Sequence, residues 1–240
     1  MQTYLINLDK DKERLAAADV QLKKLGVDYE RFPAVYAKEL PQAERDASVN
    51  YFRWWCCLGR KILLGEIGCA LSHYRLYQKM IIDNIPYACI LEDDIILKDN
   101  FKETVDKVDK WLNSSESQVV LLSNHTNEPE GKEGIREIQN GLCTESYIIT
   151  LPAAKALLKE NFPIKVPCDY WARWVKHGAI KLYLAMPSVC TQNFDGFVSN
   201  MADSANIQSV KNMNFVLRFI HSAKRAIGIS LDSLFCAMEK

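Results

Sequence analysis

A continuous apolar run ends in three consecutive acidic residues, and this arrangement constrains the fold more than any other part of the chain. The run covers residues 87–91 (YACIL), and Glu92, Asp93 and Asp94 follow it directly. Such a run is typical of a central strand covered on both faces, as in an α/β sheet. Adjacent carboxylates repel one another and resist burial, whereas a hard divalent cation removes both penalties. The triplet therefore predicts a metal site at the carboxyl end of a strand, with a solvated acidic turn as the alternative.

Strand and helix patterns alternate around this run. Residues 3–8 predict a buried strand, and apolar residues at helical spacing follow from Asp11, a suitable N-cap, to Gly26. A long amphipathic helix is predicted over residues 65–84, before Pro86. Elsewhere the patterns predict strands over 27–35, 118–123, 145–150 and 180–185, and helices over 101–112, 152–160 and 169–177. Thr150 is placed to cap the helix over 152–160. This order is typical of an α/β domain.

Three segments lack this pattern. Residues 37–64 are irregular, and residues 124–141 are polar with three Gly and one Pro, which is typical of a mobile loop. From residue 194 onward a loop-like stretch precedes an amphipathic helix, in which basic residues lie beside an apolar stripe. We therefore expect one α/β domain over residues 1–193 and a C-terminal loop and helical extension over 194–240.

Composition narrows the class of protein. Lys and Arg together number 30, as do Asp and Glu, so the net charge is zero and we expect no nucleic-acid partner. None of the eight Cys forms a CxxC pair, so we expect reduced and mostly buried thiols rather than a zinc site or a disulfide framework. The chain shows neither a signal-peptide pattern nor an apolar stretch that would span a bilayer, and we therefore expect a cytoplasmic protein.

Three motifs in a fixed order carry a family resemblance. They are INLDKDKER at residues 6–14, GEIGCALSHYRLYQKMI at 65–81 and ILEDDI at 90–95. Together they resemble glycosyltransferase family 25, known from bacterial lipopolysaccharide galactosyltransferases and animal collagen galactosyltransferases. Weaker matches extend the resemblance over residues 3–193: SYIITLPAAKALL at 146–158, PCDYW at 167–171 and MPSVCTQ at 186–192.

The resemblance implies a fold and a reaction. It implies a GT-A type, Rossmann-like nucleotide-sugar-binding fold with a mixed, mainly parallel central sheet, in which residues 1–193 are the catalytic domain. It also implies a UDP-sugar donor, most often UDP-galactose, Mn²⁺ or another divalent cation, and inversion at the anomeric carbon. The acceptor would be a lipopolysaccharide or another oligosaccharide or lipid-linked surface glycan. The alternatives are a non-catalytic glycan-binding relative and a metal-dependent nucleotidyltransferase, although the absence of Gly from INLDKDKER argues against the latter.

The motifs nominate ligands for the metal and the nucleotide. Glu92 and Asp94 occupy alternate positions and would face one side of an extended strand, so they are the predicted metal ligands, and Asp93 is predicted to contact the donor. Asn7 and Asp9 follow the first strand, where they would either bind the base or ribose or merely form the turn.

The two predicted helices add further donor contacts. Arg14 would reach a phosphate or ribose, or else be an ordinary exposed helix residue. Gly65 and Glu66 open the long helix, where free N–H groups attract an anion and where an acidic side chain also favours the helix dipole by itself. His73 would donate to the diphosphate or act as a polar packing residue.

An inverting transfer also needs a general base and an acceptor site. Asp169 is the predicted base, with a plain N-cap role as the alternative, and Asp195 is a weaker competitor. Trp171 is the preferred aromatic contact for an acceptor sugar, ahead of the other tryptophans. Residues 211–228 would either contact the cytoplasmic face of the inner membrane, near a lipid-linked acceptor, or pack on the catalytic domain.

Overall fold

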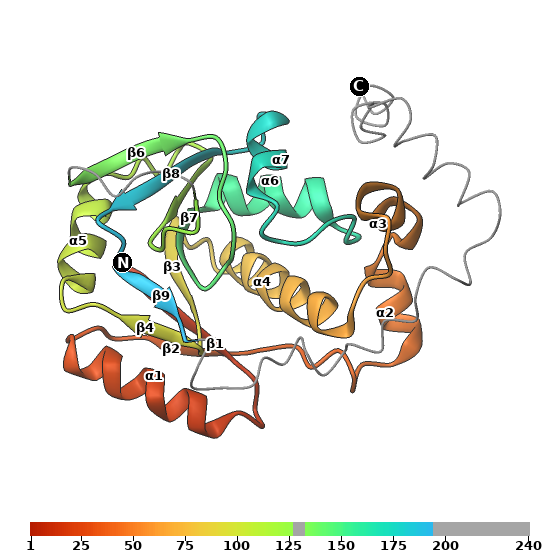
Figure 1. The fold of residues 1–240 in the computed structure, drawn as a ribbon, viewed down its shortest axis with the longest axis horizontal. Helices are drawn as coiled ribbons and strands as arrows, with labels where there is room; N and C mark the ends of the chain where they lie inside the picture. The colour runs from red at the N-terminus through yellow and green to blue at the C-terminus, as the bar shows by residue number, and fades with distance from the viewer. Residues whose placement is uncertain (127–132, 194–240) are drawn as a thin grey trace.

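The computed structural model describes residues 1–126 and 133–193, which form a seven-stranded sheet between two groups of helices (Figure 1). The strand order is β2-β1-β3-β7-β5-β8-β6. These strands are β1 (Gln2–Asn7), β2 (Glu30–Pro33), β3 (Tyr87–Glu92), β5 (Gln118–Leu121), β6 (Gly134–Ile138), β7 (Ser146–Thr150) and β8 (Lys181–Met186). A small antiparallel sheet joins β4 (Ile95–Leu97) to β9 (Cys190–Gln192). The helices are α1 (Lys12–Lys24), α2 (Gln42–Ser48), α3 (Tyr51–Leu58), α4 (Leu64–Ile82), α5 (Phe101–Trp111), α6 (Leu151–Asn161) and α7 (Trp171–Lys176).

The strand directions confirm the predicted α/β class. Strand β1 runs parallel to both β2 and β3, and β5 runs parallel to β8. Strand β7 is antiparallel to β3 and β5, and β6 is antiparallel to β8. Five of the seven strands therefore share one direction, and β6 and β7 oppose them, so the sheet is mixed and mainly parallel as expected.

Alternate residues of the central strands enter separate cores on the two faces of the sheet. Ala88 and Ile90 of β3 pack into the core beneath α4 and α6, whereas Cys89 and Leu91 pack beneath α1 and α5. All four side chains are fully buried. Strand β3 is apolar at every position of this run because both of its faces are covered by helices.

Two residues of the GEIGCALSH motif bring the segment after β2 against α4. A Cβ atom on Gly68 would lie 2.6 Å from the carbonyl oxygen of Val35, so only glycine allows this approach. The Ser72 hydroxyl accepts from the Val35 N–H at 2.8 Å and donates to the Gly68 carbonyl at 2.6 Å. The motif therefore positions a loop beside the long helix as well as contributing side chains to the site.

Several local predictions differ from the structure. Residues 37–64 contain α2 and α3, and the predicted loop 124–141 contains the edge strand β6, which forms by pairing with β8. Asp11 is the N-cap position of α1, but its side chain makes no capping hydrogen bond. Thr150, in contrast, caps α6 as its sequence position predicts.

The predicted C-terminal extension, with Asp195 and the membrane-contacting residues 211–228, lies outside the described residues. The division of the chain near residue 193 accordingly stays a prediction. Within residues 1–126 and 133–193, the helices are all too short or too polar to cross a membrane.

Candidate active site

A cavity of about 410 Å³ lies where the carboxyl ends of β1 and β3 meet the beginning of α4. It gathers the side chains that the sequence motifs nominate from distant parts of the chain. Nine of the ten predicted site residues line it: Asn7, Arg14, Gly65, Glu66, His73, Glu92, Asp93, Asp94 and Asp169. The tenth, Asp9, is largely exposed and does not line the cavity.

Asp93 joins the ends of β1, α1 and β3. Its two carboxylate oxygens accept from Asn7 Nδ2 at 2.7 Å and from an Arg14 guanidinium nitrogen at 3.0 Å. Burial raises the pKa of Asp93, although Asn7 and Arg14 act in the opposite direction. Arg14 is itself buried, so it is not the ordinary exposed helix residue that was its alternative role.

Arg31 belongs to the same polar group, and the sequence analysis did not nominate it. From β2 it donates to the Asn7 side-chain oxygen at 2.9 Å, to the Asn7 carbonyl at 3.1 Å and to Asp9. Asn7 therefore lines the cavity, whereas Asp9 meets Arg31 outside it. Only the parallel pairing of β1 with β2 brings Arg31 there, and no local pattern signals it.

Asp94 has one satisfied and one unsatisfied carboxylate oxygen. Oδ2 accepts from Gln192 Nε2 at 3.0 Å and lies 3.7 Å from Arg14. Oδ1 is buried and has no hydrogen-bond partner within the described part of the chain. Burial, reinforced by the charge of Glu92, raises the pKa of Asp94 to about 6. A buried carboxylate oxygen without a partner is costly, and a bound cation would satisfy it.

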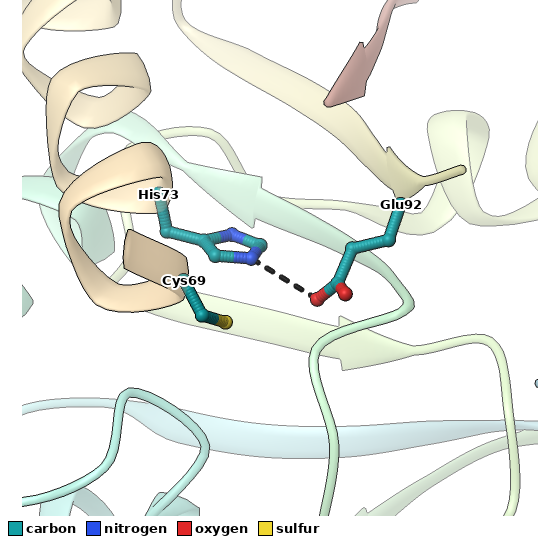
Figure 2. A group of neighbouring side chains, drawn as sticks. All are labelled: Cys69, His73 and Glu92. Atoms are coloured by element: carbon teal, nitrogen blue, oxygen red, sulfur yellow. Dashed lines mark hydrogen bonds and ion pairs between the residues drawn. The ribbon is translucent and has the colours of Figure 1, made fainter. Parts of the chain in front are cut away.

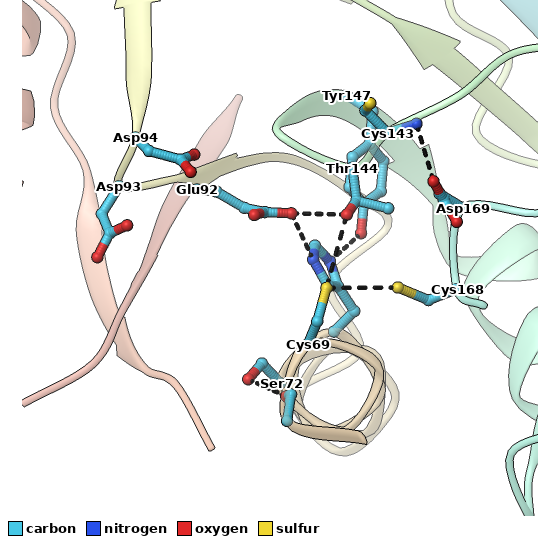
Figure 3. A network of polar contacts seen from close by, with 12 residues as sticks. Cys69, Ser72, Glu92, Asp93, Asp94, Cys143, Thr144, Tyr147, Cys168 and Asp169 are labelled. Atoms are coloured by element: carbon cyan, nitrogen blue, oxygen red, sulfur yellow. Dashed lines mark hydrogen bonds and ion pairs between the residues drawn. The ribbon is translucent and has the colours of Figure 1, made fainter. Parts of the chain in front are cut away.

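Glu92 turns toward α4 and the segment before β7 (Figures 2 and 3). Its Oε1 accepts from the Thr144 hydroxyl at 2.6 Å and contacts His73 Nε2 at 3.2 Å. Strand β3 ends at Glu92, so the extended alternation that would place Glu92 and Asp94 on one side does not continue to Asp94. The two predicted metal ligands therefore have different surroundings.

His73 continues this hydrogen-bonded chain into the core. Its Nδ1 lies 2.6 Å from the Tyr147 hydroxyl, which in turn lies 2.7 Å from the Tyr77 hydroxyl. Burial by itself lowers the pKa of His73, but the hydrogen bonds with Cys69 and Glu92 outweigh it and raise the pKa to about 9. A protonated ring donates at both nitrogens, which fixes its orientation and the position of Glu92.

The beginning of α4 is held by Glu66. Its carboxylate accepts from the Leu63 N–H at 2.8 Å and from two Arg60 nitrogens at 2.7 and 2.5 Å. These contacts cap the helix, so the local role considered for Glu66 is realised in the structure. Gly65 lines the cavity beside it.

Asp169 and Trp171 both hydrogen-bond the backbone of Cys143. Asp169 Oδ2 accepts from the Cys143 N–H at 3.1 Å, and Trp171 Nε1 donates to the Cys143 carbonyl at 2.9 Å (Figure 3 shows the first contact). Burial raises the pKa of Asp169. Helix α7 begins at Trp171 with Tyr170 as its N-cap, so Asp169 precedes the helix and is not its cap.

The predicted acceptor contact of Trp171 is wrong. The side chain is completely buried, and its indole N–H already bonds the Cys143 carbonyl. Trp54 and Trp174 are likewise core residues with about 1% of their surface exposed. Burying a large aromatic side chain is favourable because it removes a large apolar area from water, and these three tryptophans pack in the core.

Among the residues that the structure describes, two groups of side chains offer metal-ligating atoms, and within each group these atoms all lie within 4.8 Å of one another. One is Cys69, His73 and Glu92, in which α4 presents the first two toward Glu92 (Figure 2). The other is His125, Cys143 and Glu145. The sequence motifs pointed only to His73 and Glu92 among these residues, because spacing along the chain does not show which Cys and His meet in space.

Comparison with known proteins decides the family. Residues 1–172 match the model described as Glycosyltransferase family 25 (LPS biosynthesis protein). The chain belongs to glycosyltransferase family 25. The matched residues of this family 25 chain include the ten predicted site residues considered above, whereas Gln192 and the weaker base candidate Asp195 lie beyond them.

Curated relatives of this family 25 chain come from animals and bacteria. A Glycosyltransferase 25 family member of Aedes aegypti is 29% identical, over 89% of this chain and 39% of that protein. Procollagen galactosyltransferase 1-A of Xenopus laevis is 27% identical, over 70% of this chain and 30% of that protein. Lipooligosaccharide biosynthesis protein lic2B of Haemophilus influenzae is 29% identical, over 48% of this chain and 41% of that protein. The chain thus spans less than half the length of each of these three relatives.

Proposed function

We propose that this family 25 chain transfers a hexose, galactose in the first instance, from a UDP-sugar to a lipopolysaccharide or other surface-glycan acceptor with inversion. One observation carries the proposal: nine residues nominated by separate motifs line one cavity at the carboxyl ends of β1 and β3. Ligands of open α/β sheets bind at this edge. The proposal includes a GT-A arrangement, in which this cavity is the donor site.

The residues present fit a divalent cation, Mn²⁺ in this proposal. Asp94 is the leading ligand, because its buried Oδ1 has no partner within the described segments and a cation would satisfy it. Glu92 is the second proposed ligand, although Thr144 and His73 already engage one of its oxygens. When bound, such a cation neutralises the negative charge that grows on the departing nucleoside diphosphate.

Other residues would orient the donor. Asn7, Asp9, Arg14 and Asp93 form the polar group at the end of β1, where we place the base and ribose. Gly65, Glu66 and His73 come from α4, line the same cavity and would face the diphosphate or the sugar. His73 has both ring nitrogens engaged, so it positions Glu92 rather than donating freely.

Asp169 is the proposed general base. One of its oxygens holds the Cys143 N–H, and the other would accept the proton of the acceptor hydroxyl as that hydroxyl attacks the sugar. Its raised pKa suits this task, because a base with a pKa nearer neutrality holds the transferred proton better.

The donor sugar and the acceptor rest on the relatives. One relative is named a procollagen galactosyltransferase, which favours galactose as the sugar. Another is named a lipooligosaccharide biosynthesis protein, which favours a surface glycan as the acceptor. An oligosaccharide or lipid-linked acceptor at the cytoplasmic face of the inner membrane completes the proposal. Contact of residues 211–228 with that membrane stays a prediction from the sequence.

The test incubates the purified chain with a panel of UDP-sugars, with and without Mn²⁺ and acceptor glycans, and measures UDP release. We expect UDP-galactose to be the best donor and Mn²⁺ to stimulate turnover. Asp94→Asn should reduce metal-stimulated turnover at least about 100-fold, the scale of losing a metal or oxyanion contact. Asp106→Asn is the matched control, because Asp106 is exposed on α5 and forms a surface ion pair with Lys102. No UDP release from any donor would refute the proposal, and full activity of Asp94→Asn would refute the metal assignment.

A further inference from the structure

We infer that His125, Cys143 and Glu145 form a second metal site, for a borderline divalent cation such as Zn²⁺, at the edge of the donor cavity. Their ligand atoms all lie within 4.8 Å of one another. His125 follows β5, whereas Cys143 and Glu145 immediately precede β7, and these two strands are antiparallel neighbours. A bound ion would therefore tie together the ends of two adjacent strands. This inference is independent of the proposed transferase reaction.

The donor set determines which ion the site would take. A thiolate, an imidazole and a carboxylate are typical ligands of Zn²⁺ and its analogue Co²⁺, whereas Mn²⁺ and Mg²⁺ favour oxygen ligands. Three protein ligands leave a fourth position of a tetrahedral ion open. Cys143 and Glu145 both line the cavity, so that position can take water or a ligand from it.

Glu145 provides an independent sign that a cation belongs here. Its side chain is 98% buried, since 2% of its surface is exposed. His125 Nε2 lies 2.5 Å from Oε1, but Oε2 is buried and, across residues 1–126 and 133–193, has no partner at full hydrogen-bond geometry, although the Ser123 side chain also interacts with the carboxylate. A buried carboxylate oxygen without a partner is costly, and coordination removes that cost.

The surroundings of Cys143 also favour a cation. Burial raises the pKa of its thiol, and the negative charges of Glu145, Asp169, Glu92 and Asp94 raise it further. A positive ion would offset this concentration of negative charge, and it would convert the thiol to a coordinating thiolate, with the proton passing to solvent.

The backbone of Cys143 is held in place before any ion binds. Its φ is 67°, in the left-handed region that an L-residue with a side chain seldom occupies. Asp169 accepts from its N–H and Trp171 donates to its carbonyl, so both sides of the residue are fixed. The thiol is thus presented from a rigid position, and glycine is the substitution that fits this backbone best.

Coordination requires His125 and Glu145 to move apart. Two ligands at about 2.0–2.1 Å from a tetrahedral ion lie about 3.3 Å apart, against the 2.5 Å now between His125 Nε2 and Glu145 Oε1. The gap must open by about 0.8 Å. The His125 side chain is a quarter exposed and follows the end of β5, so the ring has room to move.

The other metal-ligating group, Cys69, His73 and Glu92, is less available. His73 already contacts Tyr147 and Glu92 through its two nitrogens, and Glu92 also accepts from Thr144. An ion there would have to break these hydrogen bonds. The two groups make opposite predictions for the same cysteine substitutions.

The experiment uses the chain freed of metal with a chelator and then titrated with Co²⁺, whose thiolate charge-transfer absorption reports cysteine coordination. We expect one equivalent to bind with this absorption, Zn²⁺ to displace it, and Zn²⁺ to raise the melting temperature. Cys143→Gly should lose both the absorption and the Zn²⁺-dependent melting shift while remaining folded, because glycine fits the left-handed φ. His125→Gln should weaken binding at least about tenfold. Cys69→Ser is the matched control and should retain both signals.

Three results would overturn the inference. They are absence of stoichiometric Zn²⁺ or Co²⁺ binding, retention of the thiolate absorption in Cys143→Gly, and loss of that absorption in Cys69→Ser. The readouts are spectra and melting temperatures, so a failure of sugar transfer would leave them unaffected, and their failure would leave the transferase proposal standing.

Discussion

Replacing Ser72 with alanine removes the hydroxyl that anchors the loop after β2 to helix α4. Ser72 is 2% exposed, and its oxygen accepts from the Val35 N–H at 2.8 Å. Val35 is buried as well, so the variant leaves a backbone donor without a partner or water. The bond to the Gly68 carbonyl matters less, because the Ser72 N–H remains in position to bond that carbonyl within the helix.

The magnitude follows from the unsatisfied donor. Leaving one buried backbone N–H unpaired costs about 1–3 kcal/mol, and we take about 2 kcal/mol here. For a chain of this size, about 2 kcal/mol lowers the melting temperature by about 4–8 °C. Residues next to Val35, including Tyr36 and Lys38, line the cavity, so the loosened loop should also raise KM for the donor more than it lowers kcat.

The assay is urea unfolding and thermal melting of Ser72→Ala beside Ser115→Ala. Ser115 lies on the surface and its hydroxyl donates to the Asn113 side chain there, so its loss should change the free energy of unfolding by less than about 0.5 kcal/mol. A Ser72→Ala variant as stable as the Ser115→Ala control would show that the Val35 N–H finds another partner. The anchoring role of the GEIGCALSH serine would then be refuted.

Two further predictions concern the same cavity. Gly68→Ala should destabilise the chain, because the new Cβ would lie 2.6 Å from the Val35 carbonyl oxygen. Overpacking costs about 1–3 kcal/mol, and the better helix propensity of alanine offsets about 1 kcal/mol of this cost. Urea unfolding measures the net change, and a stabilised variant would contradict the prediction. Burial and the charge of Glu92 raise the pKa of Asp94 from about 3.8 to about 6, so the native state holds this proton more tightly than the unfolded chain does. The contribution of Asp94 to the free energy of unfolding should therefore fall as pH rises from about 4 to about 6. In a chelator, Asp94→Asn should remove this fall and gain up to about 3 kcal/mol on the wild type by pH 7, whereas a pH-independent difference between the two proteins would count against the shifted carboxyl.

The sequence was informative where short-range patterns dominate. The apolar run before Glu92 predicted a doubly covered central strand, and the periodicity over residues 65–84 predicted the long helix, which the structure has at α4. Thr150 predicted a helix start because a capping hydrogen bond spans only three residues. Periodicity and capping are local properties, so one chain segment suffices to reveal them.

The short elements were harder to predict. Helix α3 carries Trp54 and Cys56 into the core, but its eight residues are too few to establish a helical period. Strand β6 is an edge strand with a mostly polar sequence, and it exists because β8 offers it a hydrogen-bonding partner. Trp171 was misassigned because nothing in its neighbours tells whether an aromatic side chain lies inside the protein or at a sugar site.

The acidic triplet shows where the sequence by itself stops. The family motifs determined the family, the α/β class and the residues that line the cavity, because their order and chemistry are written in the chain. Only the tertiary structure gave the three acids their separate surroundings. Asp93 meets Arg14 across 79 positions, Glu92 meets Thr144 across 52, and Asp94 meets Gln192 across 98. Strand order brings these partners together, and it leaves Asp94 with the unsatisfied oxygen. The same long-range packing assembled His125, Cys143 and Glu145, whereas the spacing of the cysteines along the chain had predicted no zinc site.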